Sequence, residues 1–445
     1  MSELINSLKQ KALKNNKIEP HWYKDHNIKK GLRNDDGTGV KAILTEISDV
    51  KGYKKQDNKV IPIEGELIYR GIEIKNLVNG YLTEKRFGFE ETVYLLMFGE
   101  LPNKKELEEF SKDLAKNREL PEDFIKNILI QFPSKNIMNK LQSNVIMLYK
   151  IDKNPNDISV ENVIKQCISL IAKFPTIIAY SYQAQNQKED FFIHQPKEEL
   201  STAENFLYML RQDKQFTQLE AQILDMMLVL HAEHSGGNNS TFTTHCVTST
   251  DTDTYSAIAS ALGSLKGPKH GGANSKVMSM IKEIKENIED WDNEEEISNY
   301  LKKILNKQAG DGSGLIYGMG HAVYTKSDPR AVLLKEKAKE LAIEKDKLNE
   351  LELYNKIAKL TPGIMSEFKG KELTISPNVD FFSGFIYECL GFSKEIYTAL
   401  FAMARIAGWS AHRIEEIISG GKIIRPASIY VGPNNIEYKS LEQRE

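Results

Sequence analysis

Several features that mark particular classes of protein are scarce or missing in this sequence. The 445 residues include only three cysteines, Cys167, Cys246 and Cys389, and their spacing gives neither a disulfide framework nor a Cys-x-x-Cys metal motif. The formal net charge is only -3, so neither nucleic acid nor an anionic membrane surface is expected as a partner. Any anionic ligand must therefore be bound by local arginines.

Long apolar runs are also missing. No run approaches the ~20 residues that span a bilayer, and residues 1–30 lack the apolar stretch of a signal peptide. We therefore expect a cytoplasmic protein. What is present is ordinary for a soluble chain, because 40% of the residues are hydrophobic and 27% are charged, enough to build a large core. The length suggests two or three domains.

The helical period dominates the pattern of apolar residues, while strand alternation is rare and no internal repeat appears. Thr217 and Glu220 form a capping box ahead of one apolar helix. Asp328 can cap another helix, with Pro329 at its first position. The pattern predicts helices over residues 89–98, 104–114, 217–235, 253–265, 275–288, 379–390 and 394–418. These observations favour a mostly helical protein.

Charge divides the chain. Residues 284–305 are largely acidic and residues 335–359 mix both signs, which is typical of solvated faces. We expect residues 271–385 to form a smaller, more polar domain. Residues 1–270 and 386–445 would form a larger helical body.

Histidines cluster more than any other reactive residue. Five of the nine histidines fall between positions 231 and 321, mostly near glycines. His231 and His234 are three residues apart on one expected helix, so both are predicted on one face. That spacing could hold a metal ion, but the segment is neither HExxH nor HxxEH. A structural role at the C-terminal end of the helix remains the alternative for each.

Two of the other three histidines sit in glycine-rich segments, and His245 has no assigned role. His270 precedes Gly271, Gly272 and a helix start, where an imidazole tends to stay neutral and can donate to a developing oxyanion. His321 ends the glycine-rich run 310–320, which fits neither GxGxxG nor a Walker motif. We expect a flexible loop that carries a functional histidine.

One carboxylate and three arginines complete the candidates. Asp380 lies at the head of an expected helix, where it could be a simple cap or a base kept ionised. Arg330, Arg405 and Arg425 adjoin apolar residues, and a buried guanidinium must be paired. Each arginine could be paired with a carboxylate of the protein, or the three could together bind a ligand with two or three carboxylates, and both interpretations stay open.

Taken in order, these segments resemble the citrate synthase family. The similar segments, between residues 60 and 432, are 67–74 (LIYRGIEI), 91–102 (ETVYLLMFGELP), 231–240 (HAEHSGGNNS), 267–274 (GPKHGGAN), 320–330 (GHAVYTKSDPR) and 377–384 (PNVDFFSG), with Arg405 and Arg425.

The resemblance implies a nearly all-helical, two-domain homodimer with its active site in the cleft between domains. The family condenses acetyl-CoA with oxaloacetate and water to citrate and CoA, the first step of the tricarboxylic acid cycle. The resemblance implies that Asp380 takes a proton from the acetyl methyl group. It also implies that His270 donates to the thioester oxygen and that His321 polarises the ketone of oxaloacetate. No metal or redox cofactor is implied, since the CoA thioester is a substrate.

The remaining site residues are implied in the same way. Oxaloacetate would be bound by His234, Asn238, Arg330, Arg405 and, from the partner subunit, Arg425. CoA would contact Gly318, Gly320, Lys326 and Asn378. The sequence departs from the family pattern at two positions. Thr325 stands where members often have an arginine that can contact the CoA phosphates. Ser235 follows the second histidine of the pair, where many members have glutamate.

Two other activities stay open. A 2-methylcitrate synthase would use propionyl-CoA, one methylene larger, in a pocket whose walls could include Phe381 and Phe382. A zinc-dependent hydrolase could instead use His231, His234 and His270.

Overall fold

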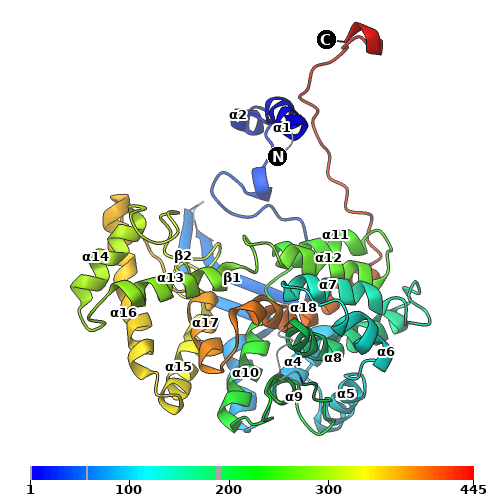
Figure 1. Ribbon diagram of the computed structural model, residues 1–445, viewed down its shortest axis with the longest axis vertical. Coiled ribbons are helices and arrows are strands. Elements are labelled where there is room, and N and C mark those ends of the chain that lie inside the picture. Colours follow the sequence, from blue (N-terminus) through cyan, green and yellow to red (C-terminus); the bar gives the residue numbers. More distant parts are fainter. Residues whose placement is uncertain (1–2, 57–58, 186–191, 445) are drawn as a thin grey trace. The chain divides into compact units, whose positions relative to one another are not determined.

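The computed structural model describes residues 3–56, 59–185 and 192–444 (Figure 1). Contacts divide the chain into two units. The large unit spans residues 44–423, and the small unit combines residues 1–43 with 424–445. This division differs from the expected domains, whose boundaries at 270/271 and 385/386 stay a prediction.

The large unit is a helical body with one small sheet. Its elements are β1 (Ser48–Gln56), β2 (Lys59–Tyr69), β3 (Ile72–Glu73), α3 (Ile74–Thr83), α4 (Phe89–Phe98), α5 (Lys104–Lys116), α6 (Glu122–Phe124), η2 (Ile125–Ile130), α7 (Ile137–Leu148), α8 (Val160–Gln185), α9 (Thr202–Leu210), α10 (Gln218–His231), α11 (Asn239–Thr248), α12 (Thr254–Leu265), α13 (Ala273–Asn287), α14 (Glu294–Leu305), α15 (Pro329–Glu344), α16 (Leu348–Lys369), α17 (Val379–Cys389), η3 (Lys394–Ile396) and α18 (Tyr397–Ser419). The fold class is therefore helical, as expected.

The small unit is built from short elements. The N-terminal part holds α1 (Glu3–Asn15), α2 (Pro20–Asp25) and η1 (Lys30–Leu32), and the C-terminal part holds η4 (Leu441–Gln443). No residue of α1 or α2 is buried. The apolar side chains of α1, among them Leu4 and Leu8, are therefore exposed.

The three-stranded antiparallel sheet, ordered β1-β2-β3, was not expected from the sequence. Lysines interrupt the apolar alternation of β1, which hides a strand that is only partly buried. The hairpin packs closely on the segment that follows His321. A Cβ atom on Gly65 would lie 2.2 Å from the carbonyl oxygen of Ser327, so only glycine permits this approach. The sheet thus supports a loop of the candidate site.

The core centres on α18, which packs against α4, α8, α10, α11 and α12 (Figure 1). Nearly all of its residues from Tyr397 to Ile414 are buried. A helix buried on every side needs apolar or small residues all round, and its alanines and Gly408 provide the small ones. Arg405 and His412 are two of the few polar side chains carried into this core.

Helix α8 corrects one expectation. By length and composition alone it could cross a membrane, so the statement that no apolar run is long enough was wrong. However, 72% of its most apolar 18-residue window is buried within the protein. The helix packs on α5, α7, α9 and α18. Its apolar surface is used in the core, because a central helix is surrounded by protein.

Most predicted helices are confirmed to within a few residues, with the capping box at Thr217 and the cap at Asp328 in place. The helix expected over 217–235 is too long by four residues, because α10 ends at His231. Ser235 then takes a φ of 67°, which a helix excludes. Consequently His231 and His234 do not share a helix face, contrary to the prediction.

The acidic and mixed-charge segments are partly solvated, as expected. Glu294 and Glu295 of α14 are exposed, but Ile297, Leu301 and Ile304 form a buried stripe. This stripe packs α14 against α16. These segments therefore form amphipathic helices, with a charged face exposed to solvent and an apolar face packed against the core.

Helix α15 offers a matched test of this packing. Leu341 is fully buried whereas Ile343, two residues on, is 62% exposed. We predict that Leu341→Ala lowers the free energy of unfolding by about 2–5 kcal/mol, because it leaves a cavity. Ile343→Ala should change it by no more than about 0.5 kcal/mol. Urea unfolding followed by circular dichroism measures both, and equal losses would contradict the packing.

Candidate active site

The turn that follows α10 directs two histidines apart. Tyr69 on β2 fixes this turn, since its hydroxyl lies 2.9 Å from the carbonyl oxygen of Glu233 and 3.1 Å from that of Val229. The backbone N–H of Glu233 also reaches the Tyr69 hydroxyl, at 3.2 Å. The turn therefore leaves the helix at a defined angle.

His231 has a structural environment. Its Nδ1 donates to the carbonyl oxygen of Met227 at 2.8 Å, and its ring packs edge-on against Phe401. Burial, more than any other cause, lowers its pKa to about 3. Its own carbonyl oxygen accepts from Nε of Arg405 at 2.8 Å. His231 thus helps to orient an arginine of the site.

His234 points elsewhere, toward His321 and Tyr324. Its ring lies edge-on to both, with centroid distances of 5.3 and 5.6 Å. Burial, followed by the charge of Arg330, holds its pKa well below 6.5. Its Nε2 is buried and has no hydrogen-bond partner among the described residues. An unpaired buried nitrogen is costly, so this atom suits a ligand oxygen.

His270 is held in one tautomer by the segment before α11. The backbone N–H of Ser240 donates to His270 Nε2 at 3.3 Å, so Nε2 accepts and the proton is assigned to Nδ1. Burial, and then Arg405, lowers the pKa of His270 to about 4. His270 is therefore a neutral imidazole whose Nδ1–H can donate, as the sequence suggested. Burial, rather than the helix dipole alone, keeps it neutral.

Two further side chains secure Ser240. Trp409 on α18 donates from Nε1 to the Ser240 hydroxyl at 3.1 Å. That hydroxyl lies 2.9 Å from His270 Nε2, to which it donates in this tautomer, and 3.0 Å from Asn238 Oδ1. Asn238 caps α11, and its Nδ2 reaches the carbonyl oxygen of Ser235 at 2.6 Å. The structure thus gives Asn238 a positioning role, while its contact with substrate stays a prediction.

His321 has the opposite tautomer. The backbone N–H groups of Val323 and Tyr324 point at its Nδ1 from 3.1 and 3.2 Å, so the proton is assigned to Nε2. The ring of Tyr324 stacks on the imidazole with a centroid distance of 4.8 Å. The loop thus presents His321 with a defined donor nitrogen.

Asn378 joins this loop to the head of α17. Its Nδ2 donates to the carbonyl oxygen of Gly320 at 2.8 Å, and its backbone N–H donates to that of Gly318 at 2.9 Å. Gly318 has a φ of 79°, and a Cβ there would lie 2.8 Å from Phe381, so glycine is required. These contacts attach the loop of His321 to the head of α17, which carries Asp380, and CoA binding by these residues stays a prediction.

Asp380 is the second residue of α17 and does not cap it. Asn378 is the cap, since its Oδ1 accepts from the Asp380 backbone N–H at 3.0 Å. The Asp380 carboxylate has no hydrogen bond among the described residues. Burial raises its pKa to about 6, while Arg330 and Arg405 oppose the rise. Asp380 is thus still mostly ionised at neutral pH, as expected of a base, although desolvation outweighs the favourable field of the helix start.

Asp328 and Arg330 form a buried pair at the start of α15. Arg330 Nε and Nη2 reach the two carboxylate oxygens of Asp328 at 3.0 and 2.8 Å. Although burial alone would lower the pKa of Arg330, Asp328 raises it above its usual value. Asp328 Oδ2 also accepts from the backbone N–H of Val379 at 3.1 Å. One carboxylate thus ties α15 to α17.

Arg405 has no carboxylate within ion-pair distance among the described residues. Its guanidinium is buried, lies over the ring of Phe401 and interacts electrostatically with Glu233 and Asp380. Burial lowers its pKa to about 10, so it stays charged at neutral pH. A ligand carboxylate would complete its environment.

Two residues with predicted ligand contacts are exposed. Lys326 is exposed and lines a cavity of about 310 Å³ together with Lys335, Lys359 and Phe382. Arg425 is exposed and belongs to the small unit. Its proposed contact across a dimer interface stays a prediction.

Within the large unit, the structure brings together the other predicted residues. Electrostatic interactions link Arg330 and Arg405 to Asp380 and to His234. Sequence reasoning missed the supporting roles of Tyr69, Ser240 and Trp409, for which no local signal exists. By contrast, the bridging role of Asp328 could have been suspected from its position two residues before Arg330.

The zinc hypothesis fails on geometry. Among the residues that the structure describes, His231, His234 and His270 do not bring their ring nitrogens into one metal-binding group. His231 is already bound to Met227, and His270 Nε2 to Ser240.

Comparison with known proteins identifies the class of this helical site. The family model described as citrate synthase, C-terminal domain, matches residues 34–427. A citrate synthase of Synechocystis is 36% identical over 408 residues, which cover 91% of this chain and 92% of that protein.

Solved structures agree. The citrate synthase of Thermotoga maritima is 36% identical, with a TM-score of 0.72 and coverage of 92% of this chain and 98% of that one. The Thermoplasma acidophilum enzyme, solved with carboxymethyl coenzyme A and oxaloacetate, is 28% identical, with a TM-score of 0.76 and coverage of 93% and 99%. The site and fold are those of a condensing, transferase-type enzyme. The chain belongs to the citrate synthase family.

The buried pair gives a stability test. We predict that Asp328→Asn lowers the free energy of unfolding by about 3–5 kcal/mol at pH 7, because Arg330 loses its counter-charge. Despite its burial, Arg330 lowers the pKa of Asp328 in the folded state. The contribution is therefore present above the unfolded pKa of about 4 and is lost as pH falls through the folded value.

Urea unfolding at a series of pH values measures this difference. The gap between wild type and Asp328→Asn should narrow in acid. The exposed Asp123→Asn is the control and should shift stability by no more than about 0.5 kcal/mol. A gap that is small at pH 7, or constant with pH, would contradict the role given to Asp328.

Proposed function

We propose that this enzyme condenses acetyl-CoA with oxaloacetate and water to give citrate and CoA. One observation carries the proposal. A carboxylate with a raised pKa, Asp380, shares a site with two imidazoles that present different donor nitrogens, Nδ1 of His270 and Nε2 of His321, and with two buried guanidinium groups. This set matches the needs of a reaction that joins an enol to a keto dicarboxylate.

The first step is proton transfer. Asp380 takes a proton from the acetyl methyl group while Nδ1–H of His270 donates to the thioester oxygen. A methyl group beside a thioester is a weak carbon acid, so one carboxylate is effective only if the developing enolate is stabilised at the same time. The raised pKa of Asp380 makes it a stronger base than an ordinary aspartate and leaves it mostly ionised at neutral pH.

The second step forms the carbon–carbon bond. The enolate carbon attacks the ketone carbon of oxaloacetate, and the ketone oxygen takes a proton from Nε2–H of His321. The proton that Asp380 took from the methyl group then returns to His321 through water, which restores both side chains. His234, with its unpaired Nε2, hydrogen-bonds to a substrate oxygen, and Arg330 and Arg405 bind the carboxylates. Water then cleaves the citryl thioester to citrate and free CoA.

The wider context of the reaction is proposed from membership of the family. We assign CoA to the backbone at Gly318 and Gly320, with Lys326 near its phosphates. We also expect a cytoplasmic homodimer in which Arg425 reaches the partner's site, and a place at the first step of the tricarboxylic acid cycle.

The acyl group is tested directly. We predict a higher kcat/KM for acetyl-CoA than for propionyl-CoA, by about 10–200-fold, since one methylene is worth about 1–3 kcal/mol. Free CoA is measured with a thiol reagent, with and without oxaloacetate and in the presence of a chelator. A preference for propionyl-CoA would make the enzyme a 2-methylcitrate synthase. CoA release that ignores oxaloacetate would contradict the condensation.

The pKa of Asp380 gives a second test. Because the base must be deprotonated, kcat/KM for acetyl-CoA should fall in acid with a midpoint near pH 6, about two units above an ordinary aspartate. Asp380→Asn should cut kcat by about 10²–10⁴-fold. On the same helix, Glu388→Gln should leave kcat unchanged.

Stability separates this effect from damage to the fold. A carboxyl whose folded pKa is raised favours the folded state at low pH, and that contribution is lost as pH rises through about 6. Asp380→Asn should therefore be as stable as wild type, or more stable, at pH 7.5 by thermal unfolding. An inactive but destabilised variant would leave the assignment of the base unsupported.

A further inference from the structure

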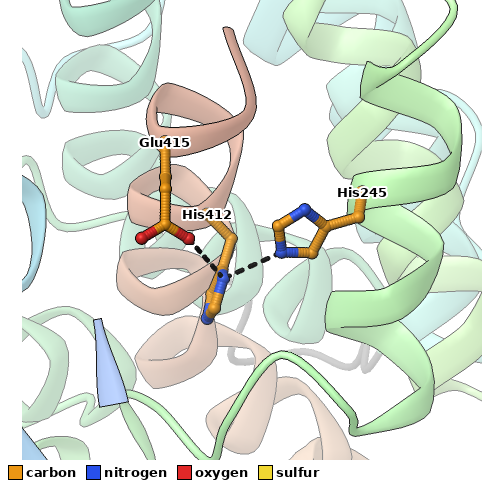
Figure 2. A group of neighbouring side chains, drawn as sticks. All are labelled: His245, His412 and Glu415. Carbon is orange, nitrogen blue, oxygen red and sulfur yellow. Dashed lines mark hydrogen bonds and ion pairs between the residues drawn. The ribbon is translucent and has the colours of Figure 1, made fainter. Parts of the chain in front are cut away.

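A second group of ionisable side chains lies between α11 and α18, and the proposed mechanism does not use it. His245 on α11 and His412 on α18 are buried, and Glu415, one turn after His412, is 17% exposed. Figure 2 shows the three side chains pointing toward one another. Their ligand atoms all lie within 4.8 Å of each other.

A carboxylate supports each imidazole from its far side. Nδ1 of His245 lies 2.7 Å from Oε2 of Glu416, and Nε2 of His412 lies 3.0 Å from Oε1 of Glu233. Glu233 Oε1 also accepts from the Ser48 hydroxyl at 2.9 Å. At these distances the ring nitrogen that faces each carboxylate is its hydrogen-bond donor.

Counting protons shows that the two ring nitrogens that face each other, Nε2 of His245 and Nδ1 of His412, carry no hydrogen when both imidazoles are neutral. Two neutral imidazoles carry two N–H groups, and both are committed to Glu233 and Glu416. Nε2 of His245 and Nδ1 of His412 then face each other with lone pairs at 3.0 Å. That distance is unfavourable unless a cation lies between the rings, either a shared proton or a metal ion.

Metal coordination fits these distances. Zinc–nitrogen bonds of about 2.0–2.1 Å in tetrahedral geometry place neighbouring ligand atoms about 3.3–3.4 Å apart. The two nitrogens are 3.0 Å apart, and His412 Nδ1 lies 3.7 Å from Oε2 of Glu415. That Glu415 oxygen is buried and makes no hydrogen bond among the described residues. The ligand atoms of His245 and Glu415 lie within 4.8 Å of each other, so a shift of roughly an ångström, mainly in the Glu415 side chain, would complete three ligands at tetrahedral separations.

We propose that His245, His412 and Glu415 bind one divalent transition-metal ion of the zinc class. Two imidazoles and one carboxylate are a common zinc ligand set. Hydrogen bonds from ligand histidines to carboxylates are typical of metal sites, and here Glu416 and Glu233 accept them. The other oxygen of Glu415 accepts from the backbone N–H of Glu46 at 2.8 Å, which fixes the third ligand. The ion would crosslink α11 to α18.

Zinc binding to the untagged full-length protein tests the site. After removal of metal with a chelator, zinc is titrated against a chromophoric competitor, and bound zinc is counted by elemental analysis. Wild type should bind one zinc ion per chain. Cobalt(II) should give the visible absorption of a low-coordinate site, which added zinc abolishes. Thermal unfolding of wild type should move to higher temperature with zinc, because the ion binds only the folded state.

Three variants locate the ion. His245→Gln removes one ligand, and Glu415→Gln removes another while it keeps the acceptor for Glu46. Each should weaken zinc binding by more than about 100-fold, since loss of a supporting partner alone typically costs about 10–100-fold. Glu416→Gln removes only a supporting carboxylate, so it should weaken zinc binding by about 10–100-fold. The exposed His21→Gln should bind zinc as wild type does.

A shared proton is the outcome that would overturn the proposal. In that case wild type would bind no more zinc than the His245→Gln and Glu415→Gln variants, provided that circular dichroism shows all three to be folded. An unchanged zinc affinity in both variants would overturn it equally. These readouts do not involve CoA release, so they are independent of the proposed activity.

Discussion

The carboxylate of Asp328 is the constraint on which the arrangement of the site depends. It is fully buried, forms two bonds to Arg330 and accepts from the backbone at the head of α17. Arg330 is thereby fixed relative to Asp380, which lies one residue beyond Val379. A desolvated carboxylate in this position is tolerated because a guanidinium and backbone N–H groups satisfy its oxygens. The loop of His321 is then attached to the same helix head through Asn378.

The electrostatics of the site follow from burial with few compensating partners. Buried Arg405 lies near His234, His270 and Asp380, and buried Arg330 lies near His234 and Asp380. Both guanidinium groups favour neutral imidazoles and an ionised carboxylate. Desolvation opposes the ionisation of Asp380 and raises its pKa to about 6. The result is a base near its useful range beside neutral hydrogen-bond donors. A buried charge needs a partner, and the two arginines differ in this respect. Arg330 is paired with Asp328, whereas Arg405 has no carboxylate within ion-pair distance among the described residues.

Sequence patterns predicted the helices well where local chemistry decides. The capping box at Thr217 and the Asp328–Pro329 start are short-range interactions, so their residues alone indicate them. The pattern failed where tertiary contacts prevail. Helix α10 stops at His231 because Tyr69, far away in sequence, holds the following turn. The β1–β2 hairpin was missed because its burial comes from segments that lie more than 250 residues away, such as Ser327. The apolar length of α8 was underestimated for a related reason, since a central helix is apolar on all sides.

By itself the sequence determined the helical fold class and the types of reactive residue, because helical periodicity, caps and motifs are local properties of the chain. It also supplied the order of motifs through which the family could be recognised. Only the tertiary structure decided which atoms of those residues can act. The tautomers of His270 and His321 depend on backbone N–H groups of neighbouring segments, and the pKa of Asp380 depends on how deeply it is buried. The separate cluster of His245, His412 and Glu415 exists only because α11 packs on α18. Residues 167 positions apart cannot be paired from the sequence, since their contact depends on how the helices pack.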